Sequence, residues 1–388
     1  MNITFSAADE AMWEEYGVLA RRAYGHDVPD IARLGRHADR RVALRGGRVI
    51  AGGLGLPVPQ WFGGRPVPGA SMACGCVAPE ERGGRLSARL AAERLRRLRE
   101  QGAVVATLWT ASNGYLRRMG WEAPTQVFSW TVPTDALKQV GAERLEITFG
   151  DTEYLAKMRD GLAGQWNGPW QRPAWWNAWQ QDQHPDLDTY AFAAPGHLPS
   201  GALALAVRRH PVDGLRLVVY DFWAADHPTA AAMLSFLGGH HSRIPTVAFE
   251  RTGLPPGMLL LHGLEKGGAA TARAWHPWML RILNPCRAVE LRGWPEHADT
   301  EIVLDLVAGD GSGTDRYTLR IGDGCGELHR GGNSAHVTLS EGKFAVWYAG
   351  GYRNAAAAAL AGVRGDVAAI ARLLAVTGDR EPWLADYF

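Results

Sequence analysis

Periodic and alternating apolar positions divide the first third of the chain into recognisable elements. In chain order the pattern predicts a helix over 8–22, strands over 41–44, 49–54 and 70–78, a helix over 86–100 and a strand over 104–110. The 86–100 helix has Ala88, Ala91, Leu95 and Leu98 on one face, as an amphipathic helix requires. A glycine pair between the first two strands is typical of a hairpin.

The remaining pattern predicts two further units. One has a strand over 145–149, a helix over 151–160, strands over 202–208 and 215–222, a helix over 228–237 and a strand over 245–249. The other has strands over 286–291, 302–307, 317–321, 326–329 and 335–339 and helices over 343–348, 354–360 and 367–374. Strands followed by helices indicate an α+β module. We therefore predict a mixed α+β chain with domains at 1–130, 131–283 and 284–388.

Composition narrows the class of protein. The chain has 388 residues, more than one typical core accommodates. With 41 basic and 40 acidic residues the net charge is +1, which gives no support for a nucleic-acid or membrane partner. Neither a signal peptide nor a transmembrane stretch is evident, so we expect a cytoplasmic protein. The cysteines (Cys74, Cys76, Cys286 and Cys325) are irregularly spaced, and we predict no disulfide framework and no metal site.

The segment from Cys76 to Ser87 carries the first indication of chemistry. An apolar run stops at Pro79, the pair Gly83-Gly84 lies in a basic turn, and a helix follows. Free N–H groups and the dipole at a helix start favour an anion, and glycine permits close backbone approach. The segment therefore predicts a site for a phosphorylated cofactor. An ordinary strand-to-helix connection is the alternative.

The next motif gives the turn a family context. After the 104–110 strand the chain reads Ser112-Asn113-Gly114-Tyr115-Leu116-Arg117-Arg118-Met119-Gly120-Trp121. Together with the preceding turn this resembles the GNAT superfamily of N-acetyltransferases, whose Arg-x-x-Gly-x-Gly/Ala turn binds the pyrophosphate of acetyl-CoA. The resemblance implies acetyl-CoA, or another acyl-CoA, as co-substrate. It also implies these cofactor-binding residues: Cys76, Val77, Ala78, Arg82, Gly83, Gly84, Arg85, Leu86, Ser87, Ser112 and Asn113.

The whole chain is similar to the Eis-type (enhanced intracellular survival) acetyltransferases. The likeness lies in the cofactor turn, in Trp278–Glu290, and in Trp347–Gly351 with the ending Pro382–Phe388. It implies a GNAT domain, a degenerate second GNAT domain and a sterol-carrier-protein-like domain. It further implies a small amine substrate, such as an aminoglycoside or another secondary metabolite, and a homo-oligomer, a hexamer in the family.

The family resemblance also implies roles for individual residues. Tyr115 would donate a proton to the leaving thiolate, and the terminal carboxylate of Phe388 would accept the amine proton, because a protonated amine is no nucleophile. The loops that border the amine pocket in the family correspond here to His26, Asp27, Asp30, Trp61, Trp166 and Trp170. Trp166 and Trp170 belong to a tryptophan-rich stretch that could instead form a domain interface.

Two positions depart from the family pattern. Arg85 occupies the place of the family glycine, where its side chain would either crowd the pyrophosphate or bind it. Leu116 occupies the place of the family tyrosine, and Tyr115 lies one residue earlier, about 100° around a helix. A GNAT-like protein of a biosynthetic pathway that does not use acetyl-CoA, and binds a metabolite or catalyses a cofactor-free rearrangement, is therefore the alternative function.

Overall fold

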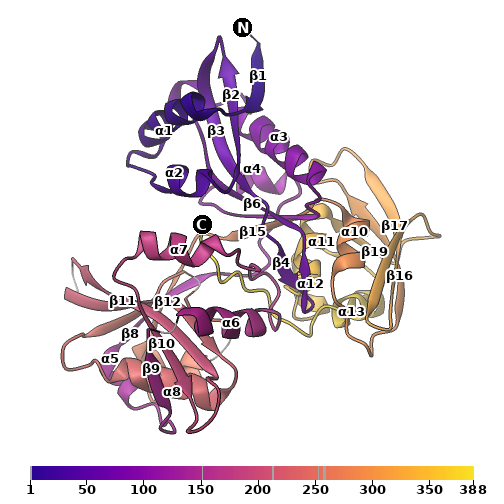
Figure 1. Ribbon diagram of the computed structural model, residues 1–388. Helices are drawn as coiled ribbons and strands as arrows, with labels where there is room; N and C mark the ends of the chain where they lie inside the picture. The colour runs from indigo at the N-terminus through magenta and orange to yellow at the C-terminus, as the bar shows by residue number, and fades with distance from the viewer. Residues whose placement is uncertain (1, 151, 212–213, 252, 257–258) are drawn as a thin grey trace. The chain divides into compact units, whose positions relative to one another are not determined.

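The computed structural model describes residues 2–150, 152–211, 214–251, 253–256 and 259–388. The chain forms two compact units of mixed α+β structure (Figure 1). Unit 1 comprises Met1–Thr125, Pro277–Arg380 and Phe388, and unit 2 comprises Gln126–His276 and Glu381–Tyr387. The predicted mixed α+β fold class is confirmed.

A six-stranded sheet in the order β1-β2-β3-β6-β7-β15 forms the first half of unit 1. Its strands are β1 (Ile3–Ala7), β2 (Asp39–Arg45), β3 (Arg48–Leu56), β6 (Gly69–Val77), β7 (Val105–Trp109) and β15 (Trp278–Ile282). Its helices are α1 (Glu10–Tyr24), α2 (Asp30–Gly35), the 3₁₀ turn η1 (Pro79–Glu81), α3 (Leu86–Glu100) and α4 (Gly114–Arg117). A Cβ on Gly52 would meet Tyr16 of α1, whereas one on Gly53 would meet Arg94 of α3. Because successive strand residues face opposite sides, α1 and α3 cover opposite faces of the sheet (Figure 1).

Two irregularities open this sheet beside α3. The parallel strands β6 and β7 pair only from Gly69↔Val105 to Ser71↔Thr107, although β6 continues to Val77. Against β3, the register of β6 shifts between Gly52 and Leu54, so that Cys74 and Gly75 form a β-bulge. Strands β6 and β7 therefore diverge where β6 approaches the turn that leads into α3.

Strand β15 comes from a distant part of the chain. It lies at the end of the predicted domain 131–283, and it pairs with β7 from Trp278↔Trp109 to Ile282↔Val105. Trp278 is fully buried, and its indole donates a hydrogen bond to the Thr107 hydroxyl. The sequence pattern predicts no strand here, and the apolar run Trp278–Ile282 does not identify the sheet that it joins.

The rest of unit 1 contains a five-stranded sheet in the order β18-β17-β16-β19-β20. The strands of this sheet are β16 (Thr300–Val307), β17 (Thr314–Gly322), β18 (Cys325–Arg330), β19 (Val337–Ser340) and β20 (Arg364–Gly365). The helices of this part are α10 (Pro285–Leu291), α11 (Glu341–Tyr348), α12 (Ala355–Leu360) and α13 (Val367–Ala375). A separate hairpin of unit 1 consists of β4 (Gln60–Phe62) and β5 (Arg65–Val67). Residues 286–291 form α10 instead of the expected strand. The Asn284 side chain caps this helix by accepting from Arg287 N at 3.2 Å, and Pro285 occupies its first turn.

Unit 2 is a seven-stranded sheet in the order β14-β8-β13-β12-β11-β10-β9. Its elements are β8 (Phe128–Pro133), β9 (Glu146–Phe149), β10 (Asp188–Ala193), β11 (Gly201–His210), β12 (Gly214–Ala224), β13 (Thr246–Phe249), β14 (Thr271–Ala274), α5 (Thr134–Lys138), α6 (Thr152–Ala163), α7 (Trp175–Gln183), α8 (His227–Gly238), α9 (Leu259–Gly263) and the 3₁₀ turn η2 (Gly267–Ala269). Phe192, Phe222, Phe249 and Met233 are buried in its core.

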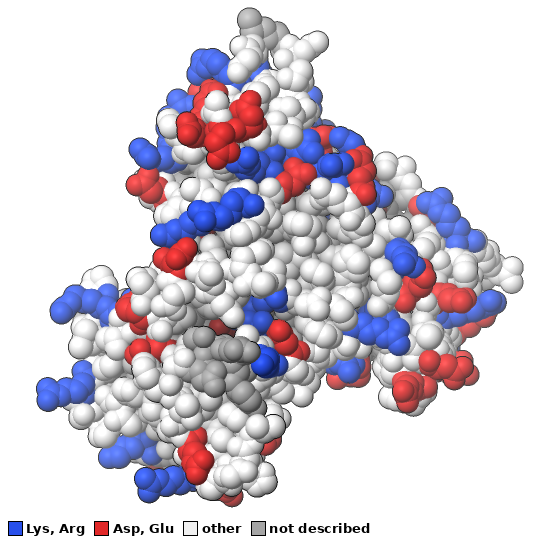
Figure 2. Space-filling model, in the orientation of Figure 1, with Lys and Arg blue, Asp and Glu red and all other residues white. Residues whose placement is uncertain are grey.

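The surface and the cysteines add little specialised chemistry. On the face that Figure 2 shows, basic and acidic side chains intermingle, as the net charge of +1 suggests. All four cysteines are free. Among the described residues, no helix combines the length and apolarity that crossing a membrane needs, and no three His, Cys, Asp or Glu side chains gather as a metal site would require.

Candidate functional site

A cavity of about 710 Å³ in unit 1 follows the opening between β6 and β7. Three segments line most of it: the end of β6 with the turn into α3, one side of α3, and the loop from Trp109 into α4. Tyr24 of α1 and the terminal residue Phe388 complete the lining. The predicted residues that line this cavity are Cys76, Val77, Arg82, Gly83, Arg85, Leu86, Ser87, Ser112, Tyr115 and Phe388.

The turn before α3 is built to receive an anion. Arg85 is the residue that precedes the helix, and it offers no side-chain acceptor to the first turn. Among the described residues the backbone N–H groups from Gly83 to Ser87 find no acceptor. Unsatisfied donors at a helix N-terminus, with the helix dipole behind them, bind phosphate groups.

Backbone geometry explains how Arg85 replaces the family glycine. Its φ is 57° and its ψ is 15°, the left-handed conformation that glycine adopts without strain. Gly83 also has a positive φ, 94°, and the space beside its Cα is open. The turn thus keeps its shape with an arginine in it, at a cost of about 1–2 kcal/mol. The exposed Arg85 side chain lies at the cavity wall.

At the inner end of the cavity, side chains from both faces of the sheet hold the β6 bulge. Cys74 has a φ of 48°, and its carbonyl oxygen accepts a hydrogen bond from Tyr16 Oη. The carbonyl of Gly75 accepts from Tyr24 Oη at 3.0 Å, and that of Ala73 accepts from Arg94 Nη2 at 2.9 Å. Three side-chain donors therefore hold the carbonyl groups of the bulge.

The thiols beside the bulge stay protonated at neutral pH. Burial raises the pKa of the Cys74 thiol to about 12, and the carboxylate of Asp30 acts in the same direction. Burial also raises the pKa of Cys76, although a hydrogen bond from Tyr16 opposes this shift. Because a neutral thiol is a weak nucleophile, neither cysteine is activated for covalent catalysis.

The loop after β7 brings Tyr115 to the cavity despite the one-residue shift. Leu116 is 1% exposed and packs in the core with Trp121. Tyr115 lines the cavity, and burial raises the pKa of its phenol, while the positive charge of Arg94 opposes the rise. α4 has only four residues, so the preceding loop rather than a long helix sets the direction of this side chain.

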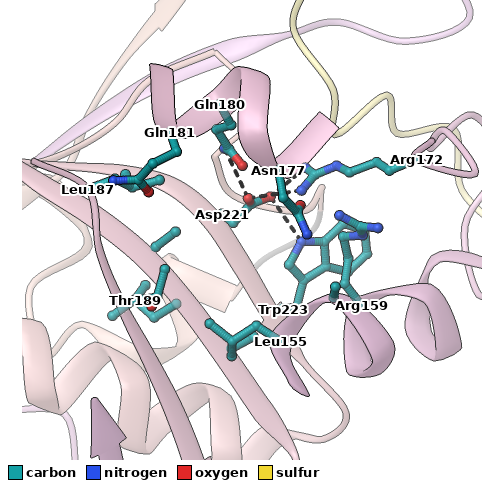
Figure 3. A pocket seen from close by; sticks show the side chains of 14 residues that line it. Leu155, Arg159, Arg172, Asn177, Gln180, Gln181, Leu187, Thr189, Asp221 and Trp223 are labelled. Atoms are coloured by element: carbon teal, nitrogen blue, oxygen red, sulfur yellow. Dashed lines mark hydrogen bonds and ion pairs between the residues drawn. The ribbon is translucent and has the colours of Figure 1, made fainter. Parts of the chain in front are cut away.

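In unit 2, a buried ionic cluster secures the segment that precedes Phe388. The Arg172 guanidinium contacts the Asp221 carboxylate at 2.7 Å (Figure 3). It also contacts the Asp386 carboxylate at 2.5 Å, and its side chain is 4% exposed. Asp386 also accepts from the backbone N of Trp170 at 2.7 Å. Although burial favours the uncharged form, the two carboxylates raise the pKa of Arg172 above its ordinary value.

The tryptophan-rich stretch packs against the same segment. The ring of Trp383 lies 5.3 Å from that of Trp166 and 4.7 Å from that of Trp223, centroid to centroid. Trp170 is 1% exposed and meets Trp176 edge-on at 5.0 Å. These rings form a second packed cluster in unit 2 around its C-terminal segment, and none of them lines the cavity of unit 1.

A second, smaller cavity adjoins the ionic cluster. Side chains from α6, α7, β11 and β12 surround about 70 Å³, with Gln180, Arg172 and Asp221 at its polar side (Figure 3). A water molecule takes about 30 Å³ of liquid volume, so this space suits one or two waters rather than a nucleotide cofactor. The cavity of unit 1, ten times larger, is the candidate active site.

Several predicted site residues lie outside the large cavity. Ala78 is buried and its N–H donates to Ile50 O at 2.9 Å, so this amide is unavailable to a cofactor. Gly84 and Asn113 adjoin lining residues in the sequence but do not line the cavity themselves. The residues predicted for the amine pocket are also absent from the lining: His26, Asp27, Asp30 and Trp61. Asp27 forms a surface pair with Arg21 at 2.5 Å.

Among the lining residues that the sequence did not predict as site residues, Tyr24 and Arg94 stand out because they hold the β6 bulge. Arg94 lies on the buried face of α3 between Leu90 and Leu98. Arg94 stands four residues from a leucine on each side, so it interrupts the apolar stripe of α3. This interruption was the signal in the sequence that could have identified it. Tyr24 is the last residue of α1, and its role depends on the distant β6 bulge, which gives no local signal.

Comparisons with known proteins agree with this architecture. Residues 4–123 and 168–282 each match a family described as "Acetyltransferase (GNAT) domain", and residues 285–385 match "Sterol carrier protein domain". A Streptomyces avermitilis protein described as an uncharacterized N-acetyltransferase is 28% identical, over 89% of this chain and 87% of that protein.

Solved structures share the fold over the full chain. The GCN5-related N-acetyltransferase from Anabaena variabilis has a TM-score of 0.88 with 23% identity, covering 100% of both chains. Eis1 from Mycobacterium abscessus has a TM-score of 0.78 with 16% identity, also over 100% of both chains. The chain therefore belongs to the GNAT family of N-acetyltransferases, with two GNAT domains and a C-terminal sterol carrier protein domain in the Eis-type arrangement.

Proposed function

We propose that this enzyme transfers the acyl group of acetyl-CoA, or of another acyl-CoA, directly to a small amine in the large cavity of unit 1. One observation carries the proposal: a single cavity connects the uncapped N-terminus of α3 with Tyr115 and the chain terminus at Phe388. An anion-binding turn, a phenol and a carboxylate are the groups that direct acyl transfer requires.

The residues of the cavity fit the parts of coenzyme A. The N–H groups from Gly83 to Ser87, with the guanidinium groups of Arg82 and Arg85, would hold the pyrophosphate. The pantetheine arm would lie where β6 and β7 no longer pair, because its amides can take up backbone hydrogen-bonding positions there. Acetyl-CoA supplies the activated acyl group, and the chain supplies position and proton transfer.

Proton transfer at both ends of the reaction balances the chemistry. The amine nitrogen bonds to the thioester carbon as the carbon–sulfur bond breaks; the carboxylate of Phe388 accepts a proton from the amine, and Tyr115 gives one to the thiolate. Terminal carboxylates ordinarily titrate near pH 3.5, so Phe388 would be ionised at neutral pH. An ordinary tyrosine is about 1.5 pKa units weaker as an acid than a thiol, about 2 kcal/mol uphill. Burial raises the pKa of the Tyr115 phenol and so enlarges this deficit, and the nearby positive charge of Arg94 offsets part of the rise.

The amine and the assembly state are part of the proposal. By its likeness to the Eis type we propose a small cationic substrate, such as an aminoglycoside or another secondary metabolite, and a hexamer of the 42.2 kDa chain. Light scattering of the purified protein measures the assembly mass, and a particle of one or two chains would contradict the hexamer.

The test of function is thiol release from acetyl-CoA with kanamycin and a panel of primary amines. We compare the native enzyme with Tyr115→Phe, a deletion of Phe388, and Phe388→Ala, which removes the ring but keeps a terminal carboxylate. Loss of the acid or the base should lower kcat about 10²–10⁴-fold, and Phe388→Ala should lose much less. Acetyl-CoA binding with unchanged turnover in the first two variants would refute these roles. Failure of acetyl-CoA to bind would refute the function.

A further inference from the structure

Arg94 places a buried positive charge at the inner end of the large cavity. The residue lines the cavity and is 5% exposed. Its Nη2 donates to the carbonyl oxygens of Leu54 in β3 and Ala73 in β6, next to the bulge. Its Nε is buried and has no acceptor in the described part of the chain.

The bulge leaves room for this guanidinium only because glycine stands on both sides of it. A Cβ on Gly53 would come within 2.5 Å of Arg94 Nη1, and a Cβ on Gly75 within 2.9 Å. Nη1 makes no hydrogen bond with any residue that the structure describes. The guanidinium therefore still has donors to offer beside Gly75, which itself lines the cavity.

The groups around Arg94 do not neutralise it. Tyr16, Tyr24, Tyr115 and Cys74 are its electrostatic neighbours, and all four are uncharged at neutral pH because burial raises their pKa values. Within the described ranges no carboxylate lies at ion-pair distance from Arg94. A cation buried without a counter-charge is unfavourable, so the site favours a ligand that brings one.

Two acidic side chains of this region have other partners or positions. Glu81 lines the cavity near the turn before α3, and it pairs with Arg45 at 2.8 Å. Asp30 acts electrostatically on Cys74 but does not line the cavity. The terminal carboxylate of Phe388 also lines the cavity, and the proposed reaction uses it as the base for the amine rather than as a counter-charge for Arg94.

The distance along α3 separates this charge from the phosphate-binding turn. Arg94 follows Arg85 by nine residues, which is about 13–14 Å at a rise of 1.5 Å per residue. A ligand that has its phosphates at Arg85 and extends along α3 brings its acyl end, not its nucleotide, to Arg94. Arg94 therefore acts on the acyl group.

We propose that the enzyme selects acyl-CoA donors whose acyl group ends in a carboxylate, and that Arg94 pairs with this carboxylate. The proposal rests on the proposed function, because it names the acyl class for the same site. A purely structural role in holding the bulge carbonyls is the competing explanation, and it predicts no preference between charged and uncharged acyl groups.

The test compares malonyl-CoA with butyryl-CoA, which have acyl groups of matched length, by calorimetric titration without any amine. Coenzyme A itself is the reference ligand. The native enzyme should bind malonyl-CoA at least about tenfold more tightly than butyryl-CoA, as one added charge-assisted hydrogen bond gives. Arg94→Met, which keeps an unbranched side chain, should abolish the preference, and Arg94→Lys should retain part of it.

Each outcome decides between specific alternatives. If the native enzyme binds both donors equally, the inference about Arg94 is wrong while the proposed function stands. If Arg94→Met retains the preference, another group provides it and the inference is also wrong. If none of the CoA ligands binds, the proposed function itself fails. Should Arg94→Met not fold, the comparison of the two donors on the native enzyme still decides.

Discussion

Asp386→Asn is the most informative change to the segment that leads to Phe388. The substitution keeps the size of the side chain and removes its charge. Asp386 is 1% exposed, and it accepts from Arg172 Nε at 2.5 Å and from Trp170 N at 2.7 Å. The variant therefore removes one charge from a buried pair and leaves the rest of unit 2 unchanged.

The size of the effect follows from what Arg172 retains. Removal of one partner of a buried ion pair costs about 3–5 kcal/mol when the other charge is left alone. Arg172 keeps Asp221, which it contacts at 2.7 and 3.1 Å, so the lower end of this range applies. In a unit of this size about 3 kcal/mol corresponds to a fall in melting temperature of about 6–12 °C.

The assay is thermal unfolding followed by tryptophan fluorescence, because several tryptophans surround this segment. Asp186→Asn is the matched control: Asp186 pairs with Arg208 in unit 2, and the two side chains are 59% and 31% exposed. Such a pair contributes at most about 1 kcal/mol, so the control should melt within a few degrees of the native protein. Equal melting temperatures for Asp386→Asn and the native protein would refute the claim that this cluster anchors the segment.

Three further predictions concern other parts of the chain. Arg85→Gly should keep the free energy of unfolding within about 1 kcal/mol of the native value, because relief of left-handed strain offsets the conformational entropy of glycine. The same variant should bind acetyl-CoA several-fold more weakly in a titration. Strong destabilisation would contradict the first expectation. In native protein at pH 7.5, iodoacetamide should modify the exposed Cys325 and leave Cys74 unmodified, as peptide mass spectrometry can show, because the pKa of the Cys74 thiol is raised to about 12. Burial raises the pKa of the Asp221 carboxyl, but Arg172 lowers it, and the net shift is downward. The stability from this pair is therefore present above about pH 4 and is lost as the pH falls through the lowered pKa. The free energies of urea unfolding of Asp221→Asn and of the native protein should differ at pH 7 and converge at acid pH.

The local pattern of the sequence predicts most individual elements. The 86–100 helix has the expected bounds, since its apolar stripe and the preceding glycine turn are both local features. The helix at Pro285–Leu291 was missed although its signal was local: Asn284 as a cap and Pro285 in the first turn indicate a helix start. A short apolar run favoured the strand assignment wrongly.

Long-range contacts account for what the sequence did not predict. β15 joins β7 across an interval of more than 160 residues, and no local feature names that partner. The buried Arg94 depends on a bulge in β6 and on Gly53 in another strand. Trp170 packs in the core of unit 2 because of the segment that ends the chain, so its ring, expected at a substrate pocket, is buried among other tryptophans.

Calorimetric titration of the purified protein with coenzyme A tests whether the turn before α3 binds the cofactor, and it needs neither the amine nor the acyl group. We expect one site per chain with a Kd below about 1 mM. We also expect that a bulky acidic substitution at the helix start, Ser87→Glu, abolishes the heat of binding without lowering the melting temperature of the protein. No heat from the native protein, or undiminished binding by Ser87→Glu, would contradict cofactor binding at this turn.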